Sequence, residues 1–360
     1  MKFFIKTLIA LIISAMIFPS CEENGNGENP DNNSNTVEVT DDITEVTTWS
    51  GDSIYVIKIY DFYVNNTLSI QPGAIIKFHP DGPDMTIGSG GTIIAKGTSD
   101  NPVIFTSWRD DEHGGDTNGD EDITSPASKD WGRIGTNGNN GSEFEYCEFY
   151  YGGESSYNST LEVYGSNIKV NNCIFAHNDG GDPTGWYGVL DATNAESNCE
   201  IKNNVFYDNI RPLSVSLTVQ IDDSNLFSNP DDHSEGNQYN GIFVESMNDV
   251  AHALSWTETE VAFVIDDNDW WIREGGSLTL ADNVCLKFRS DSEIVLNETN
   301  AIINYNGPGV VFTSYKDDSR KGDTNGDGDI TSPGDNDWNG IYDNLTSTYK
   351  NWSNIYYDSH

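Results

Sequence analysis

Apolar residues recur with a fixed spacing between residues 144 and 229. Two apolar residues lie five positions apart, and a Gly or Asn follows three positions later. The four copies are Phe144/Phe149/Gly152, Val170/Phe175/Asn178, Ile201/Phe206/Asn209 and Ile221/Leu226/Asn229. Their second apolar residues, at positions 149, 175, 206 and 226, are separated by 26, 31 and 20 residues. Segments this short cannot each bury a core alone, so they must stack on one another.

Stacked strand-sized segments with Asn or Gly turns are typical of a solenoid with one coil per repeat. We therefore predict an all-β fold, a right-handed single-stranded parallel β-helix, in which successive coils lie about 4.8 Å apart. Equivalent residues then form ladders through the core. One predicted ladder contains Phe149, Phe175, Phe206 and Leu226, and a neighbouring one contains Cys147, Cys173, Asn204 and Ser224. A β-sandwich is the alternative, but it does not explain the recurring spacing.

A longer repeat relates the two halves of the chain. Residues 102–134 align without a gap with residues 309–341, and both segments contain the acidic phrase "GDTNGD". The likeness extends upstream, where residues 63–78 match residues 271–288 with a two-residue insertion. We predict two related modules stacked in one rod, at residues 39–245 and, as a shorter copy, at residues 246–360.

The N-terminus has the pattern of an export signal. Lys2 and Lys6 precede the apolar run "TLIALIISAMIF", which is too short to span a bilayer as a permanent helix. Residues 1–20 resemble a bacterial lipoprotein signal peptide, which implies that Cys21 is the lipidated first residue of the mature chain. A polar tether follows at residues 21–38, and its acidic start resembles the surface-export signals of Bacteroidetes lipoproteins. The expected location is the outer membrane or cell surface, lipid-anchored and extracytoplasmic.

Several segments of the coils show a family resemblance. "TLSIQPGAIIKF", "GTIIAKGTSDNPVIFTSWRDD" and "DWGRI" resemble bacterial surface proteins with right-handed parallel β-helix repeats, which belong to the pectate-lyase-like superfamily. The resemblance implies the architecture. It does not determine an activity, because that superfamily includes lyases, hydrolases and adhesins.

Charge narrows the range of partners. The chain of 360 residues has 58 Asp and Glu against 18 Lys and Arg, and its net charge is −40. Such a chain repels nucleic acid and anionic membranes and attracts cations. We therefore expect contact with a membrane through the lipid anchor only. The four cysteines after Cys21 lie inside strand-like runs and do not form a disulfide framework at this chain length.

The repeated acidic phrase predicts two calcium sites. Calcium takes six to eight oxygen ligands, and Asp or Asn at alternate positions of a tight turn aims its side chains at one point. The phrase resembles the first half of an EF-hand loop. The predicted ligands are Asp116, Asn118, Asp120 and Asp122 in the first site and Asp323, Asn325, Asp327 and Asp329 in the second. The missing carboxylates are expected from Asp130 and Asp337, or from the pairs Asp110–Asp111 and Asp317–Asp318. A merely solvated acidic turn is the alternative.

Residues beside the phrase predict how the loops are held. Ile123 and Ile330 follow it at the same offset, and we expect them to anchor the loops to the core. Trp131 and Trp338 also share an offset, and we expect them to pin the loops to the coil. Glu121 stands where the second copy has a glycine that permits a sharp turn.

No catalytic residues are predicted. The candidate bases on or beside the central coils are Lys169, Lys202 and Arg211, and the one candidate acidic cluster, Asp231–Asp232–His233, lies in a turn-rich stretch whose composition explains it. The six histidines show no metal-ligand spacing. The alternative function is that of a polysaccharide lyase or glycoside hydrolase of the same superfamily, in which calcium would neutralise a uronate.

Binding fits the composition better than catalysis. The flat face of a β-helix can present aromatic side chains that stack on sugar rings. Trp186 is the predicted glycan contact, because "DGGDPTGWYG" is the longest insertion in a coil. We therefore expect a cell-surface, calcium-stabilised β-helix that binds a polysaccharide or a surface protein without catalysing a reaction.

Overall fold

The structure is a computed structural model that describes residues 35–79, 84–121, 123–138, 141–153, 159–180, 187–245, 249–266, 268–328 and 330–360. The chain divides into residues 1–32 and one compact unit, residues 33–360. Cys21, Asp122, Trp186 and Asp329 lie outside the described residues, so the predictions about them stay predictions. The described part consists of β-strands joined by turns and loops, and it holds no helix long and apolar enough to cross a bilayer.

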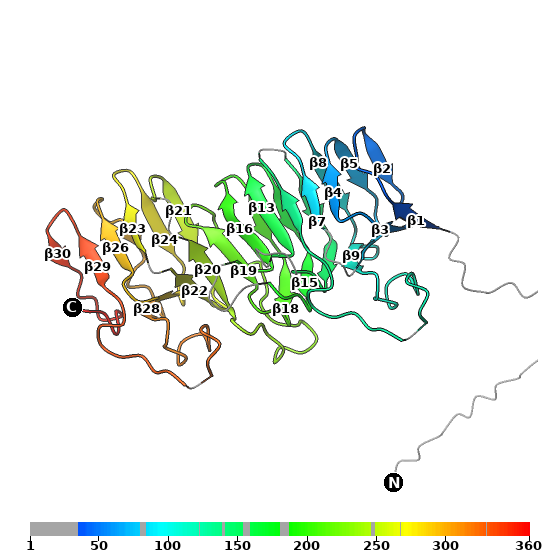
Figure 1. Ribbon diagram of the computed structural model, residues 1–360. Helices are drawn as coiled ribbons and strands as arrows, with labels where there is room; N and C mark the ends of the chain where they lie inside the picture. The colour runs from blue at the N-terminus through cyan, green and yellow to red at the C-terminus, as the bar shows by residue number, and fades with distance from the viewer. Residues whose placement is uncertain are drawn as a thin grey trace, which may run out of the picture. The chain divides into compact units, whose positions relative to one another are not determined.

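The strands of the described residues form five sheets (Figure 1). The seven-stranded sheet contains β1 (Thr36–Val39), β3 (Ile54–Ile57), β6 (Ile75–Phe78), β9 (Val103–Ser107), β12 (Cys147–Tyr150), β15 (Ile174–Ala176) and β18 (Val205–Tyr207). The ten-stranded sheet contains β4 (Asp61–Val64), β7 (Asp84–Ile87), β10 (Ile134–Thr136), β13 (Leu161–Gly165), β16 (Leu190–Ala195), β19 (Leu213–Ser216), β20 (Gly241–Glu245), β22 (Ala262–Ile265), β25 (Cys285–Phe288) and β28 (Val311–Ser314). The six-stranded sheet contains β2 (Thr47–Trp49), β5 (Thr67–Ile70), β8 (Thr92–Lys96), β11 (Glu143–Glu145), β14 (Lys169–Asn171) and β17 (Glu200–Lys202). The three-stranded sheet contains β21 (Ala253–Trp256), β24 (Ser277–Leu280) and β27 (Ile302–Ile303), and the four-stranded sheet contains β23 (Asp269–Ile272), β26 (Glu293–Leu296), β29 (Gly340–Asp343) and β30 (Thr348–Tyr349).

The strands stack as the coils of a solenoid. Successive strands of the chain belong to three different sheets in turn, so that β6, β7 and β8 are followed one coil later by β9, β10 and β11. Each pairs in parallel with its equivalent in the neighbouring coil, as in the pairs β6–β9, β7–β10 and β8–β11. Among the paired strands of the described residues, β29 and β30 alone run antiparallel. The predicted parallel β-helix is therefore confirmed, and the β-sandwich, which needs antiparallel sheets, is wrong.

The first predicted ladder is confirmed for three of its four members. Phe149, Phe175 and Phe206 pair in register, and their rings are stacked 4.6 and 5.1 Å apart. Leu226 forms a parallel β-bridge with Val205, which shifts the register by one residue. The fourth member is therefore Phe227, whose ring is stacked 5.4 Å from that of Phe206. The neighbouring ladder shows the same slip. Cys147, Cys173 and Asn204 are buried as expected, but Asn225 rather than Ser224 bonds to Asn204. The last coil therefore advances by 21 residues, not 20.

Buried asparagines stabilise the turns of the core. Asn178 and Asn209 each donate from Nδ2 to a phenylalanine carbonyl of the preceding coil, at 2.9 Å in both cases. Asn237 is the next member of this ladder, since it donates to the Phe206 carbonyl at 3.0 Å. The sequence pattern predicts Asn229 as that member, so this part of the prediction is wrong. These amides satisfy carbonyls that water cannot reach, which explains why Asn follows the apolar pair at this spacing.

The two copies of the module use different sheets. β6 and β9 of the first copy lie in the seven-stranded sheet, whereas the equivalent strands of the second copy, β25 and β28, lie in the ten-stranded sheet. The change occurs where the seven-stranded sheet ends at β18 and the four-stranded sheet begins at β23. The ten-stranded sheet continues through this junction, since β20 pairs with β22. In Figure 1 the two long loops after β9 and β28 extend from the coils on the same side of the view.

Candidate metal sites and an adjoining groove

A buried lysine supports the first acidic loop, which connects β9 to β10. Lys77 of β6 is completely buried, and its Nζ donates to the carbonyl oxygens of Asp110 and Gly115, both at 2.7 Å. Burial lowers the pKa of Lys77 to about 8, against the attraction of the neighbouring carboxylates. The loop is therefore built over an internal cationic group.

The second acidic loop, between β28 and β29, has the same support. Lys287 of β25 is completely buried and donates from Nζ to the Gly322 carbonyl at 2.6 Å and to Thr324 Oγ1 at 3.1 Å. Burial also lowers the pKa of this lysine. Sequence reasoning missed both lysines, although a Lys at the same place in the apolar runs "IIKF" and "CLKF" was the signal that could have revealed them.

The two tryptophans fasten the loops as predicted. Trp131 donates from Nε1 to the Tyr150 carbonyl at 2.7 Å, and its ring is stacked 4.3 Å from that of Phe78. Trp338 repeats both contacts with the Tyr356 carbonyl at 2.9 Å and with the Phe288 ring at 4.0 Å. Both tryptophans are fully buried, so they bind the end of each loop to the core.

The isoleucines do not fasten the loops. Ile123 is 83% exposed and Ile330 is 84% exposed, so the prediction that they anchor the loops to the core is wrong. The internal lysines and the tryptophans already attach the loops to the coils. Apolar character alone did not indicate burial here.

Three carboxylates meet in each loop. Asp111, Asp116 and Asp120 form the first trio, and Asp318, Asp323 and Asp327 form the second. In each trio, one oxygen from every carboxylate lies within 4.8 Å of the others. Two oxygens that bind one Ca²⁺ at about 2.4 Å lie at most about twice that distance apart, so each trio matches the span of one calcium coordination sphere.

The backbone of each loop is wrapped around its central aspartate. Asp116 accepts hydrogen bonds from the amides of Gly119 and Glu121, at 2.6 and 2.9 Å. Burial alone would raise the pKa of Asp116, but these amides hold the pKa below its ordinary value. Asp323 accepts hydrogen bonds from the amides of Gly326 and Gly328, at 2.6 and 2.7 Å. The loop backbone thus fixes the position of both carboxylates.

The other predicted ligands divide into two groups. The asparagines brace the turn, since Asn118 and Asn325 accept the amide hydrogens of Asp120 and Asp327 through Oδ1, at 3.1 and 3.2 Å. The remaining carboxylates bond away from the trios. Asp110 accepts a hydrogen bond from Thr106, and Asp317 accepts the equivalent one from Thr313. Asp130 accepts from Ser107 and Arg109. Asp337 accepts from Ser314 and Lys316. Of each predicted Asp–Asp pair, only the second member joins the trio.

The residues considered as catalytic bases are engaged elsewhere. Lys169 lies 3.4 Å from Glu143, and Lys202 lies 3.9 Å from Asp222. Arg211 is buried, and its guanidinium carbon lies 4.1 Å from the centre of the Phe243 ring. The turn at residues 231–233 is exposed. The structure does not bring these groups together into one site.

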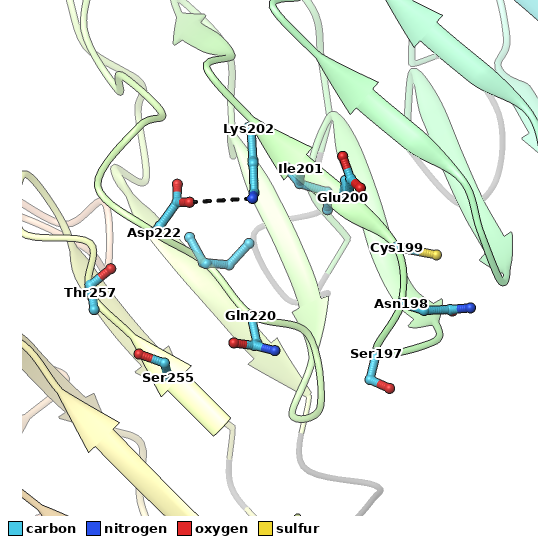
Figure 2. A pocket seen from close by; sticks show the side chains of 11 residues that line it. Ser197, Asn198, Cys199, Glu200, Ile201, Lys202, Gln220, Asp222, Ser255 and Thr257 are labelled. Atoms are coloured by element: carbon cyan, nitrogen blue, oxygen red, sulfur yellow. Dashed lines mark ion pairs between the residues drawn. The ribbon is translucent and has the colours of Figure 1, made fainter. Parts of the chain in front are cut away.

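A small pocket lies at the junction between the six-stranded and three-stranded sheets. Figure 2 shows side chains from β17, from the turn around Gln220 and from β21 around a cavity of about 330 Å³. The ion pair of Lys202 with Asp222 crosses it. No aromatic side chain is among the lining residues that the structure describes, so this pocket offers polar groups and little flat apolar surface.

A larger groove adjoins the end of the first acidic loop. Its volume is about 530 Å³, and Ser128 of the loop forms part of its wall. The corner residues that follow β12, β15 and β18 also line it, namely Tyr151, His177 and Asp208. The rings of Tyr151 and His177 are stacked 5.7 Å apart, and His177 Nδ1 lies 2.7 Å from Asp208 Oδ2.

No protein-family model, curated protein or solved structure matches the chain.

Proposed function

We propose that this protein is a calcium-stabilised β-helix that binds glycans or surface partners outside the cell and catalyses no reaction. The observation that carries the proposal is the duplicated trio of carboxylates, in two loops built on the same plan. A lipid anchor at Cys21, like that of the bacterial surface lipoproteins the sequence resembles, would hold the rod at the outer membrane.

The chemistry of the trios favours calcium. Their donors are carboxylate oxygens, which suit hard cations. Three aspartates within 4.8 Å repel one another unless a cation neutralises them. In the first trio, Asp120 Oδ1 is shielded from solvent and has no hydrogen-bond partner among the described residues. A bound cation would satisfy that oxygen.

Each trio supplies three of the ligands that calcium requires. Backbone carbonyls of the loops and water would complete a shell of six to eight oxygens. The ion would link the start of each loop, at Asp111 or Asp318, to its central turn. Calcium therefore acts here by ordering two loops that a buried lysine and a tryptophan already attach to the coils.

A binding role follows from the rigid scaffold and the surface charge. A net charge of −40 disfavours polyanionic ligands, including polyuronates, unless cations bridge them. The stacked coils hold partly exposed aromatic side chains in fixed positions, which suits the recognition of sugars. The rod thus combines an ion-dependent fold with a surface for uncharged partners.

The test is a thermal unfolding experiment in calcium and in chelator. Calcium at one hundred times the dissociation constant is expected to stabilise each site by about 2.7 kcal/mol, because it binds only the folded loop. Asp116→Asn and Asp323→Asn each remove a charge and keep only one of the two oxygens that accept the loop amides, so each should remove about half of the stabilisation by calcium. Asp100→Asn, in an exposed turn, is the matched control. Equal melting temperatures with and without calcium would contradict the proposal.

A further inference from the structure

We propose that the groove formed by Ser128, Tyr151, His177, Asp208 and Gln238 binds a neutral sugar chain. This inference rests on the proposed glycan-binding function and gives it a location and a ligand class. The groove is distinct from both carboxylate trios, and the residue predicted from the sequence as a glycan contact, Trp186, lies outside the described residues.

The first argument is the backbone conformation of the aromatic residues. Tyr151 and His177 have φ values of 63° and 61°, and Asp208, one coil later, has 48°. Gly, Asn, Asp and His adopt this left-handed region more readily than other residues, so Tyr151 is the strained member of the three. The preceding corner of the same coils has the same conformation, with Tyr146, Asn172 and Asn203. The corner of Tyr151 differs from it because two rings on neighbouring coils, Tyr151 and His177, stack on each other and line the groove.

The second argument is the chemistry of the groove wall. Tyr151 and His177 present a stacked aromatic surface, against which the C–H groups of a sugar ring can pack. Burial and nearby acids raise the pKa of Tyr151 to about 12, so its hydroxyl stays protonated and can donate a hydrogen bond. Asp208 holds His177 Nδ1 and leaves Nε2 as the ring nitrogen available for a hydroxyl group. Polar groups beside aromatic surface are typical of ligand sites that recognise hydroxyl-rich molecules.

The third argument is charge, which selects a neutral ligand. Among the lining residues that the structure describes, Asp208 carries the sole formal charge apart from any proton on His177. Glu148 and Glu235 lie near enough to Tyr207, beside the groove, to raise the pKa of that tyrosine together with burial. The nearest lysine of the loop, Lys129, is paired with Asp179 at 3.0 Å. A uronate or sulfated sugar would therefore meet carboxylates without a compensating cation.

The loop fixes one wall of the groove. The Lys129 amide donates to the Gly152 carbonyl at 3.4 Å, and the Asp130 amide donates to the Tyr151 carbonyl at 3.0 Å. These bonds hold Ser128 beside the corner that carries Tyr151. The wall is thus attached to the rigid coil on one side and to the acidic loop on the other.

The experiment is a calorimetric titration of the calcium-saturated chain with oligosaccharides of defined charge. The probes are the hexamers of glucose, mannose, N-acetylglucosamine and galacturonate. We expect at least one neutral hexamer to bind, and hexagalacturonate to bind more weakly or not at all. Tyr151→Asn and His177→Asn should each weaken the binding about tenfold, because each removes a ring from the wall.

The variants also separate binding from folding. Asn suits the left-handed corner, so both variants should keep or raise the melting temperature while they lose the sugar. Tyr146→Asn is the matched control, since Tyr146 is a tyrosine with φ of 49° at the other corner and does not line the groove. It should leave the affinity unchanged.

Each contrary result overturns a different statement. If a neutral hexamer still binds after both ring substitutions, the groove is not the binding site, although the protein does bind glycans. Tighter binding of hexagalacturonate would overturn the selection by charge. Failure of every hexamer to bind a chain that calcium stabilises would overturn the sugar ligand, yet leave the calcium-dependent fold standing.

Discussion

The two acidic loops carry nearly the same sequence, yet they rest on different sheets and meet different neighbours. Gly114 of the first loop packs so closely on Ile54 and Ile75 that an added Cβ would lie 2.9 and 3.1 Å from their Cδ1 atoms. Its equivalent in the second loop is Lys321, whose Nζ donates to the Thr259 carbonyl on another coil. At this position the first loop therefore packs on apolar side chains, whereas the second donates a hydrogen bond to a backbone carbonyl.

This difference shows which contacts the duplicated module requires. The carboxylate trio, the buried lysine and the stacked tryptophan occur in both copies despite the change of sheet. The contacts at the base of the loops have diverged with the surroundings. The contacts shared by both copies are thus the ones that the loop structure requires. The residues that differ are the ones that contact the neighbouring coils, which differ between the copies.

The largest expected difference concerns Glu258, which adjoins the anchor of the second loop. Glu258 is completely buried, and burial raises the pKa of its carboxyl to about 8, with Asp223 and Glu260 adding to the shift. Folding therefore favours the protonated acid. Its contribution to stability is full below the ordinary value of 4.5 and is lost as the pH rises through 8. At pH 9, Glu258→Gln should stabilise the chain by about 4 kcal/mol.

Hydrogen exchange at pH 9 locates this effect. Peptides from residues 316–331 should exchange more slowly in the Glu258→Gln variant than in the parent chain, because Lys321 is bonded to the residue after Glu258. Peptides from residues 109–121 should not change. Equal slowing in both loops would show that they are not independently attached.

Replacement of the buried lysines should distinguish the two supports. Lys77→Met leaves the buried Asp110 carbonyl and the partly buried Gly115 carbonyl without this donor, whereas Lys287→Met leaves the partly buried Gly322 carbonyl and a threonine hydroxyl that can rotate. We expect local opening free energies to fall by about 3 kcal/mol in the first loop and about 2 kcal/mol in the second. Urea-dependent hydrogen exchange of each loop measures both values. A larger loss in the second loop would contradict the assigned contacts.

A glycine pair tests the packing of the two turns. Gly326 has a φ of 69°, and an added Cβ would lie 2.3 Å from Cε1 of Tyr239. Gly119, its equivalent, has a φ of 76° and no neighbour within 4 Å of an added Cβ. Both alanine variants strain the backbone, but Gly326→Ala must also displace the tyrosine ring. It should therefore destabilise the chain by about 2 kcal/mol more than Gly119→Ala, as measured by urea unfolding.

The smallest expected effect comes from a histidine that the second copy replaces with arginine. His113 Nδ1 lies 2.7 Å from Asp110 Oδ2, and this hydrogen bond raises the pKa of the histidine above 6.5. The pair stabilises the first loop below pH 6.5, and this stability is lost as the pH rises through the raised pKa. His113→Arg, which copies Arg320, should remove the dependence on pH, worth about 0.5 kcal/mol between pH 6 and 8. An unchanged pH profile of loop exchange would refute the role of the pair.

Local patterns predicted the parts of the fold that depend on local spacing. Phe149, Phe175 and Phe206 repeat in register, so the ladder and the solenoid could be recognised from the sequence. Leu226 was misplaced by one residue because its coil contains one extra position, which a spacing of apolar residues cannot distinguish when Leu and Phe are adjacent.

Features that depend on distant segments could not be predicted in the same way. Lys77 and Lys287 look like outward-facing strand residues until a loop from the next coil covers them. Ile123 and Ile330 look buried by analogy with a helical calcium motif, although the described residues after each loop contain strands and turns and no helix. The change of sheet between the copies gives no signal in the recurring spacing, whose last copy ends at residue 229, before β20 begins at Gly241.

The most direct measurement of the central claim is the number of calcium ions bound per chain at equilibrium, determined by dialysis and metal analysis. Two ions are predicted for the parent chain, one for the Asp116→Asn or Asp323→Asn variant, and none for the double variant. A parent chain that binds no calcium, or variants that retain both ions, would contradict the claim that the duplicated trios are the sites that stabilise the rod.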